Sequence, residues 1–179
     1  SQWTIDWGDG NTQIVTGNPS TVEHVYTLAG EHLITATATD EDGTYAANEL
    51  TTIIDPTVSI NGDAIVAEGD LYTLNLAING MDADGWQINW GDGSELQTVI
   101  GSLDQITHTF ADGDEQHTIT ATAITSLGDY QAASVTVDVA NVAPTLNISG
   151  NATVTATLAY TLNLQSTDPG ADAISQWTV

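Results

Sequence analysis

The sequence contains no lysine and no arginine, although 24 of its 179 residues are aspartate or glutamate. In an average soluble domain about a quarter of the residues are charged, and both signs are represented. Proteins bind nucleic acids and anionic membrane surfaces through Lys and Arg, which neutralise phosphate groups. The composition therefore excludes both partners and indicates that salt or bound cations screen the repulsion among the carboxylates.

Cysteine is also absent, so no disulfide stabilises the fold, and the redox compartment cannot be inferred from thiols. No apolar run approaches the roughly 18–20 residues that a membrane span needs, and we expect no membrane insertion. The sequence has no signal peptide and begins inside a strand pattern, so we expect that Ser1 is not a natural start.

A tryptophan-containing string occurs twice in the chain. Trp-Thr-Ile-Asp-Trp-Gly-Asp-Gly at 3–10 returns as Trp-Gln-Ile-Asn-Trp-Gly-Asp-Gly at 86–93, and the opening Ser-Gln-Trp-Thr returns at 175–178. A period of about 87 residues predicts small domains in tandem rather than a single enzyme fold.

The repeat boundaries are expected at prolines, because proline cannot donate to a strand ladder and marks the entry of a first strand. The segment that starts at Pro56 aligns with the segment that starts at Pro144. We therefore predict the C-terminal part of one repeat at 1–55, a complete repeat at 56–141 and the N-terminal part of the next repeat at 142–179.

Alternation of apolar and polar residues dominates, and helical periodicity is absent. Trp3, Ile5 and Trp7 share one face of a strand, and alanines alternate with threonines at 34–39 and again at 118–123. Further strands are predicted at 58–60, 71–78, 134–139, 146–148 and 160–165. Short strands with frequent turn signals predict an all-β fold, an immunoglobulin-like β-sandwich repeated in tandem.

The motif Trp-x-x-x-Trp-Gly-Asp-Gly is followed by His24-x-Tyr26 in one copy and by His108-x-Phe110 in the other. Together with the Thr/Ala strand, it closely resembles the PKD domain. The resemblance implies an immunoglobulin-like module of the kind that serves as a spacer or protein-interaction module in large secreted and cell-surface proteins of bacteria and archaea.

The Asp-Gly pairs at 9–10 and 92–93 predict tight turns, and we expect His24 and His108 to hydrogen-bond to them. A nucleophilic triad of Ser94, His108 and Asp92 is the enzymatic alternative. Asn11 takes the place of Ser94 in the first copy while the turn and the histidine persist. This replacement argues against catalysis, and we expect no enzyme.

His32 and His117 offer a second histidine in each copy, which raises the question of a zinc site. The spacing places each of them on a different strand from the first histidine, and no thiolate is available. Solvated or hydrogen-bonded histidines are the better interpretation.

Acidic loops suggest calcium, which takes carboxylate and carbonyl oxygens, often from Asp at alternate positions beside a Gly. The candidate ligands are Asp40 and Asp42 in one loop and Asp168 and Asp172 in another. An immunoglobulin-like topology places loops of these two kinds at the same end of a complete repeat. Asp82 and Asp84 are weaker candidates, because the middle repeat has a shorter loop there. The alternative is that all six are solvated turn residues.

These observations predict a structural extracellular or cell-surface module: a stalk, an adhesin spacer or a filament subunit. Its partners would be neighbouring repeats or copies of itself, head to tail, with Ca²⁺ as a stiffening ion. The alternative is a carbohydrate- or protein-binding accessory module of a secreted hydrolase, which needs an exposed aromatic platform.

Overall fold

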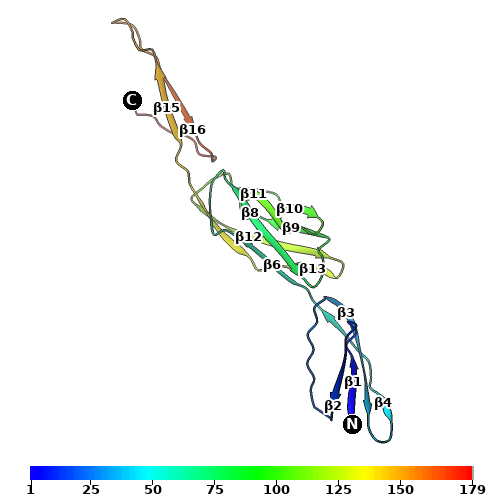
Figure 1. Cartoon of the computed structure of the whole chain (residues 1–179). Helices are drawn as coiled ribbons and strands as arrows, with labels where there is room; N and C mark the ends of the chain where they lie inside the picture. The colour runs from blue at the N-terminus through cyan, green and yellow to red at the C-terminus, as the bar shows by residue number, and fades with distance from the viewer. Residues whose placement is uncertain (179) are drawn as a thin grey trace.

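The computed structural model describes residues 1–178, and these residues form sixteen strands and no helix. The fold is therefore all-β, as the alternation predicted. A five-stranded sheet, a two-sheet sandwich and a two-stranded hairpin follow one another along one long axis (Figure 1). Within the described residues, no helix is available that is long and apolar enough to span a bilayer.

The first sheet has the strand order β2-β1-β3-β4, and β5 also pairs with β3. Its strands are β1 (Gln2–Asp6), β2 (Thr12–Thr16), β3 (Gly30–Thr39), β4 (Thr44–Ala46) and β5 (Leu50–Ile54). Alternation brings Trp3, Ile5 and Trp7 to one face of this sheet. Ile5 is buried, but the two tryptophans are only half-buried. One face of the first sheet is thus incompletely covered.

The middle of the chain is an immunoglobulin-like β-sandwich of two facing sheets. One sheet has the order β10-β9-β12-β14-β7 with β13 beside β12, and the other has the order β11-β8-β6. The strands are β6 (Thr57–Gly62), β7 (Ile65–Ala67), β8 (Leu71–Asn79), β9 (Gly85–Asn89), β10 (Gln97–Ile100), β11 (Gln105–Thr109), β12 (Glu115–Thr125), β13 (Gly128–Gln131) and β14 (Val135–Ala140).

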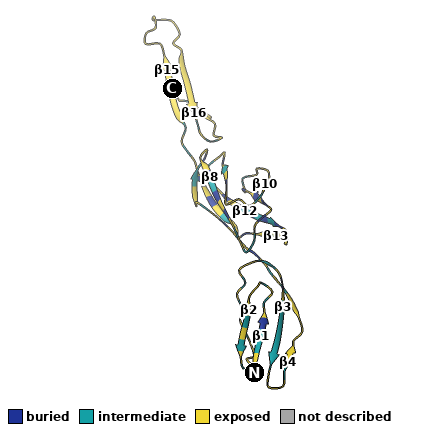
Figure 2. Cartoon of the chain, turned by 45° about the vertical axis from the view of Figure 1, so that its right-hand side comes forward, coloured by how far each residue is buried: buried dark blue, intermediate teal, exposed yellow. Residues whose placement is uncertain are grey.

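The core of the sandwich lies between these two sheets. Trp86 and Trp90 are 0% and 1% exposed, and Leu74 of the opposite sheet is 0% exposed. Buried and exposed positions alternate along β8 (Figure 2). Full burial of each such side chain contributes about 2–3 kcal/mol, which accounts for a stable middle sandwich. Both tryptophans therefore point inward, between the two sheets.

The last paired element is a hairpin of β15 (Thr145–Gly150) and β16 (Leu162–Thr167), whose residues are exposed. The strand predicted at 160–165 begins only at Leu162. In β8 the corresponding first residues pair with β11 alone, and among residues 1–178 no strand of that kind lies beside β16. Without that neighbour, Tyr160 instead donates its phenol to the Asn151 carbonyl oxygen at 2.9 Å.

Candidate functional site

The turn that links β1 to β2 holds a histidine supplied by a distant segment. His24 Nε2 lies 2.8 Å from Asp9 Oδ2, and the His24 ring stacks on Trp7 with centroids 4.7 Å apart and planes 9° apart. Tyr26, two residues further on, donates to the Trp7 carbonyl oxygen at 3.0 Å. The aromatic strand and the acidic turn are therefore joined through one imidazole ring.

The turn that links β9 to β10 has the same construction. His108 Nε2 lies 2.6 Å from Asp92 Oδ2, and its ring stacks on Trp90 with centroids 4.6 Å apart and planes 9° apart. Phe110 meets the His108 ring edge-on at 4.9 Å. The hydrogen bond from a histidine to each turn, predicted from the sequence, is confirmed in both copies.

Both turn aspartates have lowered pKa values. For Asp92, burial alone would raise the pKa, but hydrogen bonds from the Ser94 side chain and from His108 outweigh it and lower the pKa to about 2. For Asp9, the hydrogen bond from the Asn11 side chain, followed by that from His24, lowers the pKa to about 2. Both carboxylates are thus stabilised as anions by their turns.

The geometry does not produce a nucleophilic triad at Ser94. The Ser94 hydroxyl donates to Oδ1 of Asp92, whereas His108 contacts Oδ2 of the same carboxylate. A general base would have to accept the proton of the serine, and the triad order is serine, histidine, carboxylate. Here the carboxylate lies in the middle, so the group is a structural clamp on the turn.

The second histidines of the two copies are 8% exposed and lie under the aromatic residues. His117 Nδ1 lies 3.3 Å from the Gly91 carbonyl oxygen, and its ring stacks on Phe110 at 5.1 Å. His32 contacts the Gly8 carbonyl oxygen at the same distance of 3.3 Å. These contacts match the interpretation of hydrogen-bonded structural histidines.

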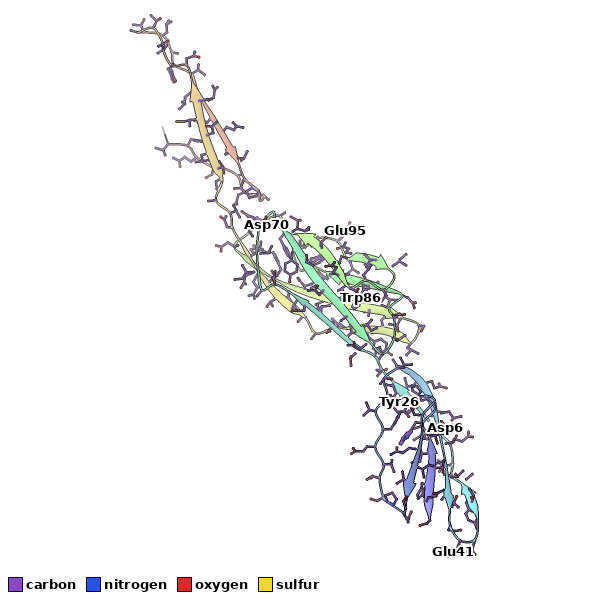
Figure 3. All side chains as sticks on the ribbon, in the orientation of Figure 1. Asp6, Tyr26, Glu41, Asp70, Trp86 and Glu95 are labelled. Atoms are coloured by element: carbon purple, nitrogen blue, oxygen red, sulfur yellow. The ribbon has the colours of Figure 1, made fainter. Side chains whose placement is uncertain are left out.

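Asp40 and Asp42 lie in the loop between β3 and β4, where both are exposed. Glu41, between them, marks the outer tip of this loop at the end of the molecule far from Asp70 (Figure 3). Asp40 Oδ1 accepts hydrogen bonds from the backbone N–H groups of Asp42 and Gly43 at 2.9 and 3.0 Å. The loop is closed by its own aspartate, and it lies far from Asp168.

Asp82 and Asp84 are also exposed, in the loop between β8 and β9. The backbone of Asp84 bonds to Ile124 and Gly101, which fixes the loop against β12 and the end of β10. Neither carboxylate belongs to a group of three acidic or histidine side chains close enough to share an ion among the described residues.

Asp168 and Asp172 lie in the loop that follows β16, which packs against the end of the sandwich. Asp172 meets Glu68 and Asp112 there, and one carboxylate oxygen of each lies within 4.8 Å of the others. Asp168 Oδ1 accepts a hydrogen bond from Gly170 at 2.8 Å, while its Oδ2 is buried without a hydrogen-bond partner.

Glu68 and Asp112 are the two members of this group that were not identified from the sequence. Glu68 follows β7 in the turn that leads into β8, and a single glutamate beside a glycine is ordinary turn composition. One signal for Glu68 was available in the sequence: when the two hairpins are aligned, the second has Ala156 where the first has this glutamate. Asp112, in the short loop before β12, was hidden by the same kind of turn composition.

Within the described residues, the fold and the histidine clamps define a β-sandwich module held together at aromatic turns. Residues 1–53 match the PKD domain family, whose members are non-catalytic modules of extracellular structural and adhesion proteins. The match covers the first sheet and the first histidine clamp. No curated protein matches the chain.

Proposed function

We propose that this chain is a structural spacer of an extracellular or cell-surface protein, in which PKD-like repeats follow one another head to tail. Stalks, adhesin spacers and filament subunits are the proteins that use such modules. The observation that carries the proposal is a hairpin that occurs twice, as β6–β8 and as β15–β16. The first sheet has an apolar face of the type that this hairpin covers in the sandwich.

The hairpin β15–β16 has the same register as β6–β8. Gly62 faces Leu74 in the first pairing, and Gly150 faces Leu162 in the second. In each hairpin a tyrosine hydroxyl lies against the glycine, where a Cβ would collide with it. The two hairpins are therefore built on one plan.

In the sandwich, the apolar side of β6–β8 covers Trp86 in β9 and Trp90 directly after it. In β15–β16 the residues at the matching positions are uncovered: Leu146 is 55% exposed, Ile148 61% and Leu164 40%. Their counterparts in the sandwich include Ile60 and Leu76, which are 8% and 4% exposed. The hairpin thus presents an apolar side that lacks a facing sheet.

The first sheet presents the complementary surface. A groove of about 350 Å³ lies over its tryptophan face, and its lining includes Trp3, Trp7, Ile34 and Ala36. In the sandwich the corresponding residues are almost completely buried under the three-stranded sheet. Residues 21–25, which correspond to β11, form no strand in the described structure, because no β8-type strand lies beside them.

The occupant that fits this groove is a hairpin of the β15–β16 type supplied by a neighbouring repeat. When this chain is alone in solution, a second copy supplies it. The β11–β8 register transferred to this contact places Glu23 opposite Thr161, as Thr107 lies opposite Thr73. A head-to-tail contact of this kind does not close on itself, so it extends into a filament.

Disulfide trapping tests the contact, because the chain has no cysteine of its own. We expect that a mixture of Glu23→Cys and Thr161→Cys chains forms a cross-linked dimer under mild oxidation. Thr51→Cys, an exposed position on β5, is the matched control for Glu23→Cys and should not cross-link with Thr161→Cys. Equal yields for both mixtures would refute the contact.

The alternative role, a binding module of a secreted hydrolase, has less support. Carbohydrate binding of the expected kind needs an exposed aromatic platform, and Trp86 and Trp90 of the sandwich are fully buried. A pull-down with chitin, cellulose and collagen tests this alternative directly. Retention on one of these materials would favour it over the spacer.

A further inference from the structure

Three carboxylates converge where the sandwich meets the last hairpin. Glu68 comes from the turn between β7 and β8, Asp112 from the loop between β11 and β12, and Asp172 from the loop after β16. One oxygen of each lies within 4.8 Å of the other two. Three separate segments therefore bring negative charge to a single point.

Glu68 is the unusual member, because it is 1% exposed and its Oε2 has no hydrogen-bond partner. Its Oε1 accepts a hydrogen bond from the Val142 backbone N–H at 2.7 Å. Charged side chains are almost never fully buried without a partner, because removing a carboxylate from water is costly. One oxygen of a buried carboxylate thus points into the acidic group without compensation.

The backbone is shaped around this carboxylate. A Cβ on Gly113 would come within 2.7 Å of Glu68 Oε2, and a Cβ on Gly170 would collide with the same carboxyl group from the other loop. Asn141, in the linker after β14, donates a hydrogen bond to Asp172 Oδ2 at 2.7 Å and so fixes the position of this second carboxylate. Two glycines and two hydrogen bonds therefore position the carboxylates.

No side chain of this protein can neutralise the group. The chain has no Lys or Arg, and His108 and His117 are engaged at the Asp92 and Gly91 turn. Asp112 and Asp172 are exposed, so water screens their charges, whereas the Glu68 carboxylate is buried. Glu68 is therefore the member of the group whose charge lacks compensation.

We propose that Glu68, Asp112 and Asp172 bind one divalent cation, and that the cation is Ca²⁺. The ligand atoms are carboxylate oxygens, with neither a thiolate nor an imidazole among them, which is the chemistry that Ca²⁺ prefers. Water and backbone carbonyl groups complete the coordination of such ions. Asp168, in the same loop as Asp172, likewise has a buried Oδ2 without a hydrogen-bond partner.

The ion joins two parts of the chain that share no strand pairing. Glu68 and Asp112 belong to the sandwich, whereas Asp172 belongs to the loop after the hairpin. The contact between the first sheet and the sandwich is different: Ala29 donates to the Gly80 carbonyl oxygen at 2.9 Å. Leu28 and Ala29 take the places of Asp112 and Gly113 there. Calcium therefore stiffens the second junction only, an inference that rests on the proposed spacer function.

Isothermal titration of the chelator-treated chain with CaCl₂ tests the site. We expect one site that Glu68→Gln weakens by about tenfold or more, because the charge of the ligand set determines calcium affinity. Asp42→Asn removes an equally negative side chain from the distant β3–β4 loop and should leave that site unchanged. Absence of binding at millimolar Ca²⁺, or equal effects of the two variants, would overturn the proposal.

Thermal melts of the same proteins add a second test, in which the melting temperatures of wild type and variant should differ in one direction in EDTA and respond differently to Ca²⁺. In EDTA, Glu68→Gln should melt at a higher temperature than the wild type, because it removes an uncompensated buried charge. With Ca²⁺ at matched ionic strength, the wild type should gain melting temperature and Glu68→Gln should not. A variant that is less stable in both conditions, with an unchanged calcium response, would contradict the site.

Small-angle X-ray scattering separates binding from stiffening. We expect Ca²⁺ to narrow the distribution of maximum dimensions of the wild type but not of Glu68→Gln. Binding without this narrowing would retain the calcium site and refute its stiffening role. Failure of the head-to-tail cross-link together with normal calcium binding would refute the spacer assembly and leave the site intact.

Discussion

The His108 ring is clamped onto Asp92, with Nε2 2.6 Å from Oδ2 of the carboxylate, and its flat face rests on Trp90. The pair joins β11 to the turn after β9, so it crosses from one sheet of the sandwich to the other. The same clamp occurs at His24, where the facing sheet is missing. The clamp is therefore a property of the turn rather than of the complete sandwich.

Replacement of His108 by Ala should lower the free energy of unfolding by about 2–3 kcal/mol, because it removes a hydrogen bond to a charged group and an aromatic stack. Urea denaturation followed by tryptophan fluorescence measures this change. Ser94→Ala removes only one donor to the same carboxylate and should cost less, about 1 kcal/mol. A hydrolytic activity that survives purification and disappears in His108→Ala would contradict the structural role.

The stability contributed by Asp92 should depend on pH in a defined window. The pKa of its carboxyl is 3.8 when unperturbed and about 2 in the folded protein. A lowered folded pKa gives stability that is fully present above the unfolded pKa and is lost as the pH falls towards the folded one. The advantage of the wild type over Asp92→Asn should therefore shrink between pH 5 and pH 2.5, by about 1 kcal/mol after solvent screening. An advantage of equal size at both pH values would show that the carboxylate is not stabilised as an anion.

Two glycines of one turn should respond differently to Ala. Gly91 has φ +79°, and a Cβ there would lie 2.5 Å from the Thr118 carbonyl oxygen. Gly93 has φ +81° with open space around it. Gly93→Ala should cost about 1 kcal/mol for the left-handed backbone alone, and Gly91→Ala about 3 kcal/mol or more because a backbone clash is added. Equal unfolding free energies for the two variants would contradict the close contact between the turn and β12.

The proposed assembly depends on the apolar side of the last hairpin. Leu164→Asp should abolish self-association in sedimentation velocity, because it introduces a charge into the contact with the tryptophan groove. Asn163→Asp adds the same charge one residue earlier, on the opposite side of β16, and should leave association unchanged. Loss of association in both variants would indicate a general charge effect rather than a defined contact.

The sequence was sufficient for the strands with clear alternation and for the histidine clamps, but it did not predict short strands such as β2, β7 and β10. Alternation at Trp86, Ile88 and Trp90 follows the pleat, and the repeated turn identified His24 and His108 as its partners. The start of β16 at Leu162 could not be predicted, because strand length there depends on a neighbouring strand and not on local propensity.

Only part of the group formed by Glu68, Asp112 and Asp172 could be predicted from the sequence. Asp168 and Asp172 stand out in a loop with a glycine, but Glu68 and Asp112 are distant in sequence and reach them only through the packing at the end of the sandwich. Asp40 and Asp42 have the same loop composition and serve their own turn. Composition identifies acidic loops, but it does not show which of them contacts a charge without a partner. The burial of Glu68 shows this, because its Oε2 has no hydrogen-bond partner.

Hydrogen–deuterium exchange at 21–25 as a function of chain concentration tests the head-to-tail account most directly. These residues correspond to β11 and form no strand in the single chain. Association with a β16-type strand would give their amides ladder hydrogen bonds and slow their exchange. The account predicts protection that rises with concentration and is lost in Leu164→Asp. Exchange at 21–25 that is equally fast at every concentration would contradict it.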